Sequence, residues 1–96
     1  MTKSVVIKNS TKSGKKLMAI FTRDNRKKTI HFGQAGAPDY TLSKDKEQRK
    51  RYLARHRKNE KWDSPETAGA LSRWILWGDS TSRGQNVKAF KSRFGY

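Results

Sequence analysis

The segment KKLMAIFT, residues 15–22, decides the expected fold. Side chains alternate between the two faces of a β-strand. Here apolar residues occupy both sets of alternating positions: Leu17, Ala19 and Phe21 form one set, and Met18 and Ile20 form the other. This pattern is typical of a central strand, or of a strand that is covered on both faces, and the residues allow either reading.

Turn-forming segments flank this strand on both sides. NSTKSG (residues 9–14) separates it from the β-branched segment SVVIK (4–8), and RDNR (23–26) separates it from KKTIHFG (27–33). Asn, Asp, Ser and Gly are the residues that tight turns favour. We therefore expect a three-stranded antiparallel meander over residues 4–33, with His31 on its wetter face.

The segment GQAGAPDYT (33–41) has the Gly and Pro content of a loop, and the apolar spacing after it becomes helical. We expect three helices there: residues 44–59 with Ser43 as N-cap, a second that begins at DSPET with Ser64 as cap and stops at Gly78, and a third over residues 83–94.

The second helix is apolar almost all round, so we expect it to be the hub of the core. Trp74 and Trp77 are then interpreted as core residues rather than as platforms for base stacking. The expected fold class is α+β: a three-stranded antiparallel meander followed by three helices, in a single basic domain over residues 1–96.

The charge balance points to a polyanionic partner. The 96 residues include 23 Lys and Arg but only eight Asp and Glu, for a formal net charge of +15. Such an excess destabilises a compact chain through self-repulsion, and a bound polyanion relieves it. Nucleic acid is the favoured partner. A membrane surface, an acidic protein or plain solubility are the alternatives.

The segment QRKRYLARHRKNEKW (48–62) carries the densest run of cations. On a helical wheel, Tyr52, Leu53 and His56 share the only face that can enter a core. The opposite face holds Lys50, Arg51, Ala54, Lys58 and Lys61, with Arg57 at its edge. An ordinary solvated helix face mixes charges of both signs, because opposite charges four residues apart stabilise it. We therefore predict that this stripe contacts phosphates, and that the small Ala54 allows a close approach.

The two hairpins carry further cations. We include Lys15, Lys16, Lys27 and Lys28 among the candidate nucleic-acid contacts, beside Lys12, Arg23 and Arg26 near the same turns. Basic hairpin tips can straddle a nucleic-acid backbone. Lysines on edge strands equally serve to prevent pairing with other chains. The sequence therefore favours neither nucleic-acid contact nor edge protection for these residues.

No pattern indicates catalysis. The chain has no Cys, which excludes thiol chemistry, disulfides and Cys/His zinc sites, and it has no phosphate-binding glycine loop. His56 and Glu60 lie four residues apart, but a structural His–carboxylate hydrogen bond is the more ordinary reading. We expect a non-enzyme without cofactor, metal or small-molecule substrate. The N-terminal apolar stretch is too short for a signal peptide, so we expect synthesis in the cytoplasm.

Several segments resemble a known group of proteins: HFG, DYT, KRYLARHRKNEKW, PETAGALSRWILWG and FKSRF, within about residues 30–94. They are similar to a family of small basic proteins of unknown function from large DNA viruses of algae and amoebae, the phycodnaviruses and mimivirus relatives. The resemblance implies a component of the virion, made in the host cytoplasm, nucleus or viral factory.

Charge and resemblance together lead to two expectations. The first is a virion-associated protein that binds and compacts duplex DNA without sequence preference. The second is a minor capsid protein that cements other shell proteins or bridges them to an acidic inner membrane, although a membrane surface is the less favoured partner. A nuclease accessory or RNA-binding module is a weaker third reading.

Overall fold

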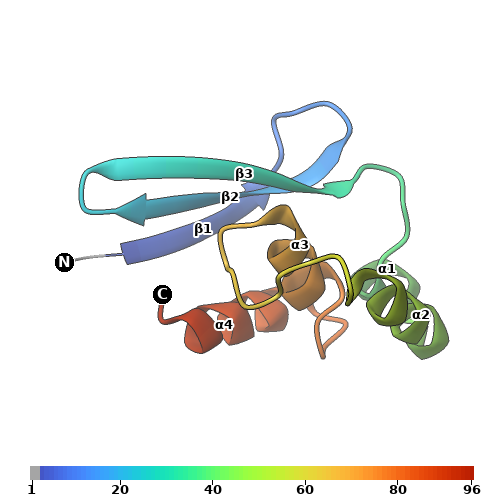
Figure 1. Ribbon diagram of the computed structural model, residues 1–96. Helices are drawn as coiled ribbons and strands as arrows, with labels where there is room; N and C mark the ends of the chain where they lie inside the picture. The colour runs from blue at the N-terminus through green and yellow to red at the C-terminus, as the bar shows by residue number, and fades with distance from the viewer. Residues whose placement is uncertain (1–2) are drawn as a thin grey trace.

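The computed structural model describes residues 3–96, in which helices cover one side of a three-stranded sheet (Figure 1). The strands are antiparallel, in the order β1 (Lys3–Asn9), β2 (Lys15–Arg23) and β3 (Arg26–Gln34). The expected α+β fold, an antiparallel meander followed by helices, is confirmed.

The central strand β2 is covered on one face only. Leu17, Ala19 and Phe21 are buried, whereas Met18 and Ile20 are half-buried on the face that the helices leave open (Figure 1). The reading of this segment as a central strand is therefore right, and cover on both faces is wrong for residues 3–96. In the same range, β1 and β3 each have one edge without a strand partner.

Four helical segments follow the sheet. They are α1 (Tyr40–Ser43), α2 (Lys46–His56), α3 (Ala68–Leu71), which continues directly as the π-helical turn η1 (Ser72–Leu76), and α4 (Arg83–Phe94). The bounds of α4 agree with the expectation. The short α1 was not expected, because one helical turn is too short to show a periodic pattern.

Two helix starts differ from the expectation. Lys44 adopts a left-handed backbone (φ 56°) and ends α1, so Asp45 rather than Ser43 caps α2, accepting the N–H groups of Glu47 and Gln48 at 3.0 and 3.2 Å. Thr67 rather than Ser64 caps α3, because its hydroxyl accepts the N–H of Ala70 at 3.2 Å while donating to the Ser64 carbonyl at 2.9 Å. A side-chain oxygen that satisfies a free N–H sets each start.

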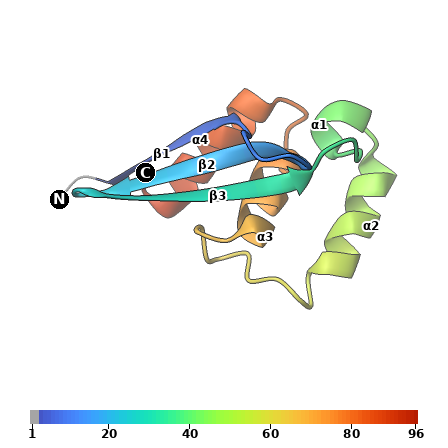
Figure 2. The ribbon, with the colours of Figure 1, turned by 90° about the horizontal axis from the view of Figure 1, so that it is seen from above.

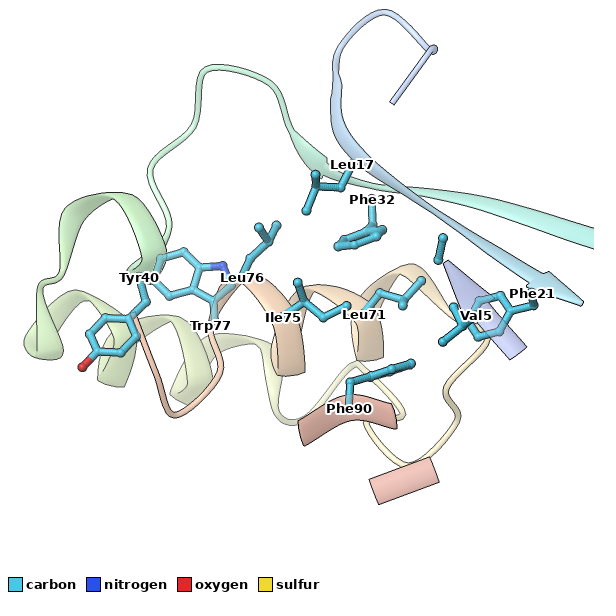
Figure 3. Close-up of a cluster of buried hydrophobic side chains, with 11 residues drawn as sticks. Val5, Leu17, Phe21, Phe32, Tyr40, Leu71, Ile75, Leu76, Trp77 and Phe90 are labelled. Atoms are coloured by element: carbon cyan, nitrogen blue, oxygen red, sulfur yellow. The ribbon is translucent and has the colours of Figure 1, made fainter. Parts of the chain in front are cut away.

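The core lies between the sheet and the α3–η1 helix, with α4 packed beneath it (Figure 3). Its buried side chains are Val5, Leu17, Ala19, Phe21, Phe32, Tyr40, Leu71, Ile75, Leu76, Trp77 and Phe90. The helix expected as hub therefore does hold the centre, and Trp77 is buried as predicted. Trp74 is half-buried at the rim of the core, with the guanidinium carbons of Arg73 and Arg93 at 4.1 and 3.7 Å from its ring centroid.

The hub helix ends at Leu76 with Trp77 as its C-cap, two residues before the expected stop at Gly78, and Gly78 lies where the chain packs tightly on itself. A Cβ atom at this position would lie 2.4 Å from the Trp74 carbonyl oxygen and 2.7 Å from the side chain of Asn86. The buried Asn86 amide in turn donates to the carbonyls of Ile75 and Ser80 at 2.9 and 2.7 Å. These bonds satisfy polar groups of the turn and hold α4 against η1.

Helix α2 lies at one end of the molecule, and the β2–β3 turn lies at the other (Figures 1 and 2). The molecule measures 41 × 28 × 25 Å along its principal axes. The basic helix α2 and the basic residues around the β2–β3 turn are therefore far apart in the folded protein.

Candidate nucleic-acid interface

Helix α2 separates its inward side chains from its outward ones. Its half-buried residues are Gln48, Arg49, Tyr52, Leu53 and His56, and its exposed residues are Lys46, Glu47, Lys50, Arg51, Ala54 and Arg55. The predicted segregation is therefore present along the helix. We call Lys46, Lys50, Arg51 and Arg55 the α2 cations.

The inward face is anchored by an aromatic stack. The Tyr52 ring is stacked with the Trp77 ring at a centroid distance of 4.1 Å and with the His56 ring at 4.0 Å. Burial, with a smaller effect of the negative charge of Glu60, raises the pKa of the Tyr52 hydroxyl to about 12. Because Tyr52 packs on the buried Trp77, the opposite side of α2 faces away from the body of the protein.

Arg49 provides a second anchor. Its Nε donates to the carbonyls of Trp77 and Gly78 at 3.2 and 3.0 Å, and its Nη2 lies 2.8 Å from Asp79 Oδ1. This arginine satisfies carbonyls at the end of the hub helix, so its guanidinium is not available to a ligand. The neighbouring Lys50 and Arg51, by contrast, are exposed.

Arg57, Lys58 and Lys61 lie beyond the helix, which corrects the helical-wheel prediction. Helix α2 ends at His56 rather than at Asn59, because the chain folds back to Glu60. Glu60 Oε2 lies 2.7 Å from His56 Nδ1, and its Oε1 accepts the Trp62 indole N–H at 3.0 Å. The structural reading of the His56–Glu60 pair is thus confirmed. All three displaced cations are exposed in the segment that follows α2.

A shallow groove of about 710 Å³ runs along one flank of α2, where the inward residues Arg49 and Leu53 meet the outward ones. Lys46, Lys50 and Ala54 line it at successive turns of the helix, and Arg57 and Trp62 line it from the segment after α2. Ala54 places no long side chain among these cations, as the sequence suggested. Two carboxylates line the groove as well: Glu47, and Asp79, which is paired with Arg49.

Few of the cations are neutralised by the protein's own carboxylates. Among residues 3–96, four of the 23 Lys and Arg side chains lie within 4 Å of an Asp or Glu oxygen: Lys16, Lys28, Arg49 and Arg83. The α2 cations, Arg57, Lys58 and Lys61 are not among the four. Their repulsion is therefore left to solvent, salt or a ligand.

The hairpin cations divide into three different settings. Lys15 is exposed and lines a cleft with Arg55 of α2, whereas Lys27 and Lys28 lie near the β2–β3 turn at the far end of the sheet (Figure 1). Lys28 lies 3.7 Å from Glu66. Lys16 is wrongly assigned as a phosphate contact, because its ammonium is largely buried 2.6 Å from Asp39 and donates to the Ala37 carbonyl.

Asp39 is the buried partner that removes Lys16 from the surface. Its carboxylate also lies 3.2 Å from Arg83 Nη2, and it accepts the Thr41 N–H at 2.9 Å as the N-cap of α1. Burial raises the pKa of this carboxyl, but hydrogen bonds from Lys16 and Thr41 and the charges of Lys16 and Arg83 outweigh that effect and hold the pKa below 3.8. The cluster ties β2, α1 and α4 together and has a structural role.

Comparison with known proteins places residues 5–56 in a family of unknown function, DUF5754. This match spans more than half of the chain. The chain belongs to this family. No curated protein and no solved structure matched the chain.

The family match covers the sheet from Val5 onward, α1 and α2, and so includes Lys50 and Arg51. Within the described residues, no three His, Asp or Glu side chains gather where a metal ion could bind. None of the helices in residues 3–96 is long and apolar enough to cross a membrane.

Sequence reasoning missed two features of this surface. Lys46 and Arg55 belong to the exposed side of α2 but lie outside the predicted stripe, because the helical wheel began at Gln48 and Arg55 falls between its two faces. The far end of the sheet carries Arg23 and Arg26 directly opposite each other. The two-residue turn between them is a signal that could have revealed this pairing.

Proposed function

We propose that this protein binds duplex DNA without sequence preference and compacts it within the virion of a large DNA virus, without catalytic activity. The observation that supports it best is the surface formed by the α2 cations and Ala54, here called the α2 surface, where exposed cations without carboxylate partners lie on an anchored helix. The viral setting rests on the resemblance of the motifs within residues 30–94.

The proposal requires contacts to the backbone rather than to bases. Lysine and arginine contacts to phosphates orient a protein on DNA but carry no sequence information. The α2 surface offers long flexible cations around a small residue, and its inward aromatic rings are already engaged in the core. This composition supports electrostatic binding to any duplex.

The salt dependence of binding tests the proposal. Six cations are exposed on α2 and directly after it: Lys46, Lys50, Arg51, Arg55, Arg57 and Lys58. If each cation neutralises one phosphate, the logarithm of the binding constant falls against the logarithm of the salt concentration with a slope of about −5. The affinity then decreases about 10³-fold between roughly 50 and 200 mM salt. Fluorescence anisotropy with two unrelated duplexes measures this slope.

A matched pair of variants locates the contact. K50E/R51E should reduce the slope by about 2, because each lost phosphate contact removes about one unit. K8E/K88E makes the same change in net charge at exposed positions on β1 and α4 and should leave the slope unchanged. A flat salt response of the wild type, or equal effects of the two variants, would contradict the assignment. Tighter binding to RNA than to duplex DNA would favour the RNA-binding reading instead.

A minor capsid protein is the second candidate function. The open face of the sheet favours it, because Val6 is 45% exposed and pairs with the half-buried Ile20 next to Met18. Exposed apolar side chains on a strand surface are suited to contact with another protein. Fractionated virions separate the two candidates: recovery with the genome supports DNA binding, and recovery with the shell or inner membrane supports the capsid role.

A further inference from the structure

Three cations form a row across the far end of the sheet. The register places Lys3 of β1 opposite Arg23 of β2, and Arg23 opposite Arg26 of β3. Residues directly opposite each other on neighbouring strands point to the same face. The next row on that face is Val5, Phe21 and Lys28, which shows that the row looks toward the helix-covered side, beyond the end of the core.

This row lines a hollow of about 440 Å³ together with Lys27, Lys28, Tyr96 and Glu66. Lys3, Arg23 and Arg26 are exposed and have no carboxylate within 4 Å among residues 3–96. Glu66 lies 3.7 Å from Lys28, and the Lys3 ammonium lies 4.5 Å from the Tyr96 ring centroid. Asp24 in the turn and Asp63 beside the neighbouring hollow are the other acids of this end. This end of the sheet therefore holds five cationic side chains and three acidic ones.

Protection of the sheet edges can explain Lys3 and Arg26 but not the whole row. Like charges directly opposite each other on neighbouring strands destabilise a sheet. Edge protection calls for charge on β1 and β3, yet the middle member, Arg23, lies on the central strand. A bound anion would relieve the repulsion of all three side chains, and bidentate guanidinium groups are well suited to phosphate.

The row and the α2 cations form two separate surfaces. They lie at opposite ends of the molecule (Figure 2), and β2, with nine residues, separates the two hairpin ends by about 26 Å. The α2 cations face away from the protein body, as the burial of Tyr52 and Leu53 shows. The row and the α2 cations are therefore two distinct exposed surfaces at opposite ends of the molecule.

We propose that the row of Lys3, Arg23 and Arg26 is a second binding site for the phosphate backbone, so that one molecule bridges two DNA duplexes. This inference rests on the proposed function of the α2 surface and supplies its mechanism of compaction. A protein with two separate phosphate sites brings a second duplex to a high effective concentration once the first is bound.

Bridging is measured with two duplexes of unrelated sequence, one held on beads and one fluorescent. The full-length protein is added, and the retained fluorescence is recorded at low salt. Wild-type protein and K8E/K88E should retain the second duplex. R23E/R26E has the same net charge as K8E/K88E. The fluorescence that it retains should be at least about tenfold lower than that of the control, because two phosphate contacts are lost. Its salt slope for a single duplex should remain that of the control.

The outcomes distinguish the two proposals. Equal losses for R23E/R26E and K8E/K88E would overturn bridging, because they would indicate aggregation by charge neutralisation alone. A slope reduced by about 2 in R23E/R26E would also overturn it, since both ends would then contact the same duplex. Absence of duplex binding by the wild type overturns both proposals. Far-ultraviolet circular dichroism and the neutral variant R23Q/R26Q, expected to lose bridging in part, control for folding.

Discussion

Replacement of Asp39 by Asn tests the buried charge cluster that joins β2, α1 and α4. The carboxylate is 1% exposed and lies 2.6 Å from the Lys16 ammonium and 3.2 Å from Arg83 Nη2. Asparagine keeps the shape and one acceptor oxygen, so it can still cap α1 through the Thr41 N–H. What it removes is the negative charge.

The expected loss of stability in D39N depends on how well Lys16 and Arg83 are solvated once the carboxylate charge is removed. The Lys16 side chain is only 11% exposed and would keep a buried charge without its counter-charge, whereas Arg83, at 35%, can turn toward water. Breaking a buried ion pair by removing one partner costs about 3–5 kcal/mol. Because the ammonium retains the Ala37 carbonyl, we expect the lower end, about 3 kcal/mol. Domains of this size have only about 5–14 kcal/mol in total.

Urea denaturation followed by tryptophan fluorescence measures the free energy of unfolding of wild type, D39N, K16M and D39N/K16M. Removal of both partners leaves no unpaired charge, so D39N/K16M should recover at least about half of the loss seen in D39N. The cycle therefore separates the cost of an unpaired ammonium from the loss of packing.

The same cluster predicts a dependence on pH. Because the folded-state pKa of Asp39 lies below its ordinary value of 3.8, its ionisation stabilises the fold above that pH. This stability is lost as the pH falls through the folded pKa, and the acid limb of D39N should be flatter. A loss below about 1 kcal/mol in D39N, or a double variant no more stable than D39N, would refute the charge-pair reasoning.

Two further substitutions probe local packing and alkaline stability. Gly78→Ala should cost about 2 kcal/mol in urea denaturation, because the new Cβ would lie 2.4 Å from the Trp74 carbonyl oxygen; Gly84→Ala, whose Cβ meets nothing closer than 3.8 Å, should instead be neutral or stabilising. The pKa of Tyr52 is raised to about 12, so its neutral hydroxyl contributes stability below pH 10 that is lost as the pH rises to about 12. Tyr52→Phe should therefore lose less stability at alkaline pH than the wild type. Urea unfolding midpoints measure that loss, and phenolate absorbance of the wild type follows the ionisation. An unchanged alkaline limb in Tyr52→Phe would show that the ring is not protected from ionisation.

The elements that the sequence predicted well are those with a repeated local pattern. Alternating side chains and turn residues identified the three strands, and the apolar spacing of Val87, Phe90 and Phe94 identified α4. Helix ends were less predictable, because a cap is decided by which side chain reaches a free N–H. Ser43 and Ser64 are good caps by residue type, yet Asp45 and Thr67 make the bonds.

The candidate site shows the same division. Exposure of Lys50 and Arg51 followed from the amphipathic pattern of α2, which is local. The burial of Lys16 did not, because its partner Asp39 lies 23 residues away and becomes adjacent only in the folded chain. Charge in a sequence therefore indicates an exposed cation only where no distant carboxylate reaches it.

The two unpaired edges of the three-stranded sheet have a consequence for how copies of this protein behave in solution. Strand edges offer free hydrogen-bonding groups to any other chain, and charged side chains keep such partners away. Here Lys3 and Lys8 lie along β1, and Arg26, Lys27 and Lys28 lie along β3, so mutual repulsion holds neighbouring molecules apart. Whatever neutralises that charge also removes the barrier to self-association. Solubility should accordingly pass through a minimum when added polyanion matches the protein's net charge, and return when either component is in excess.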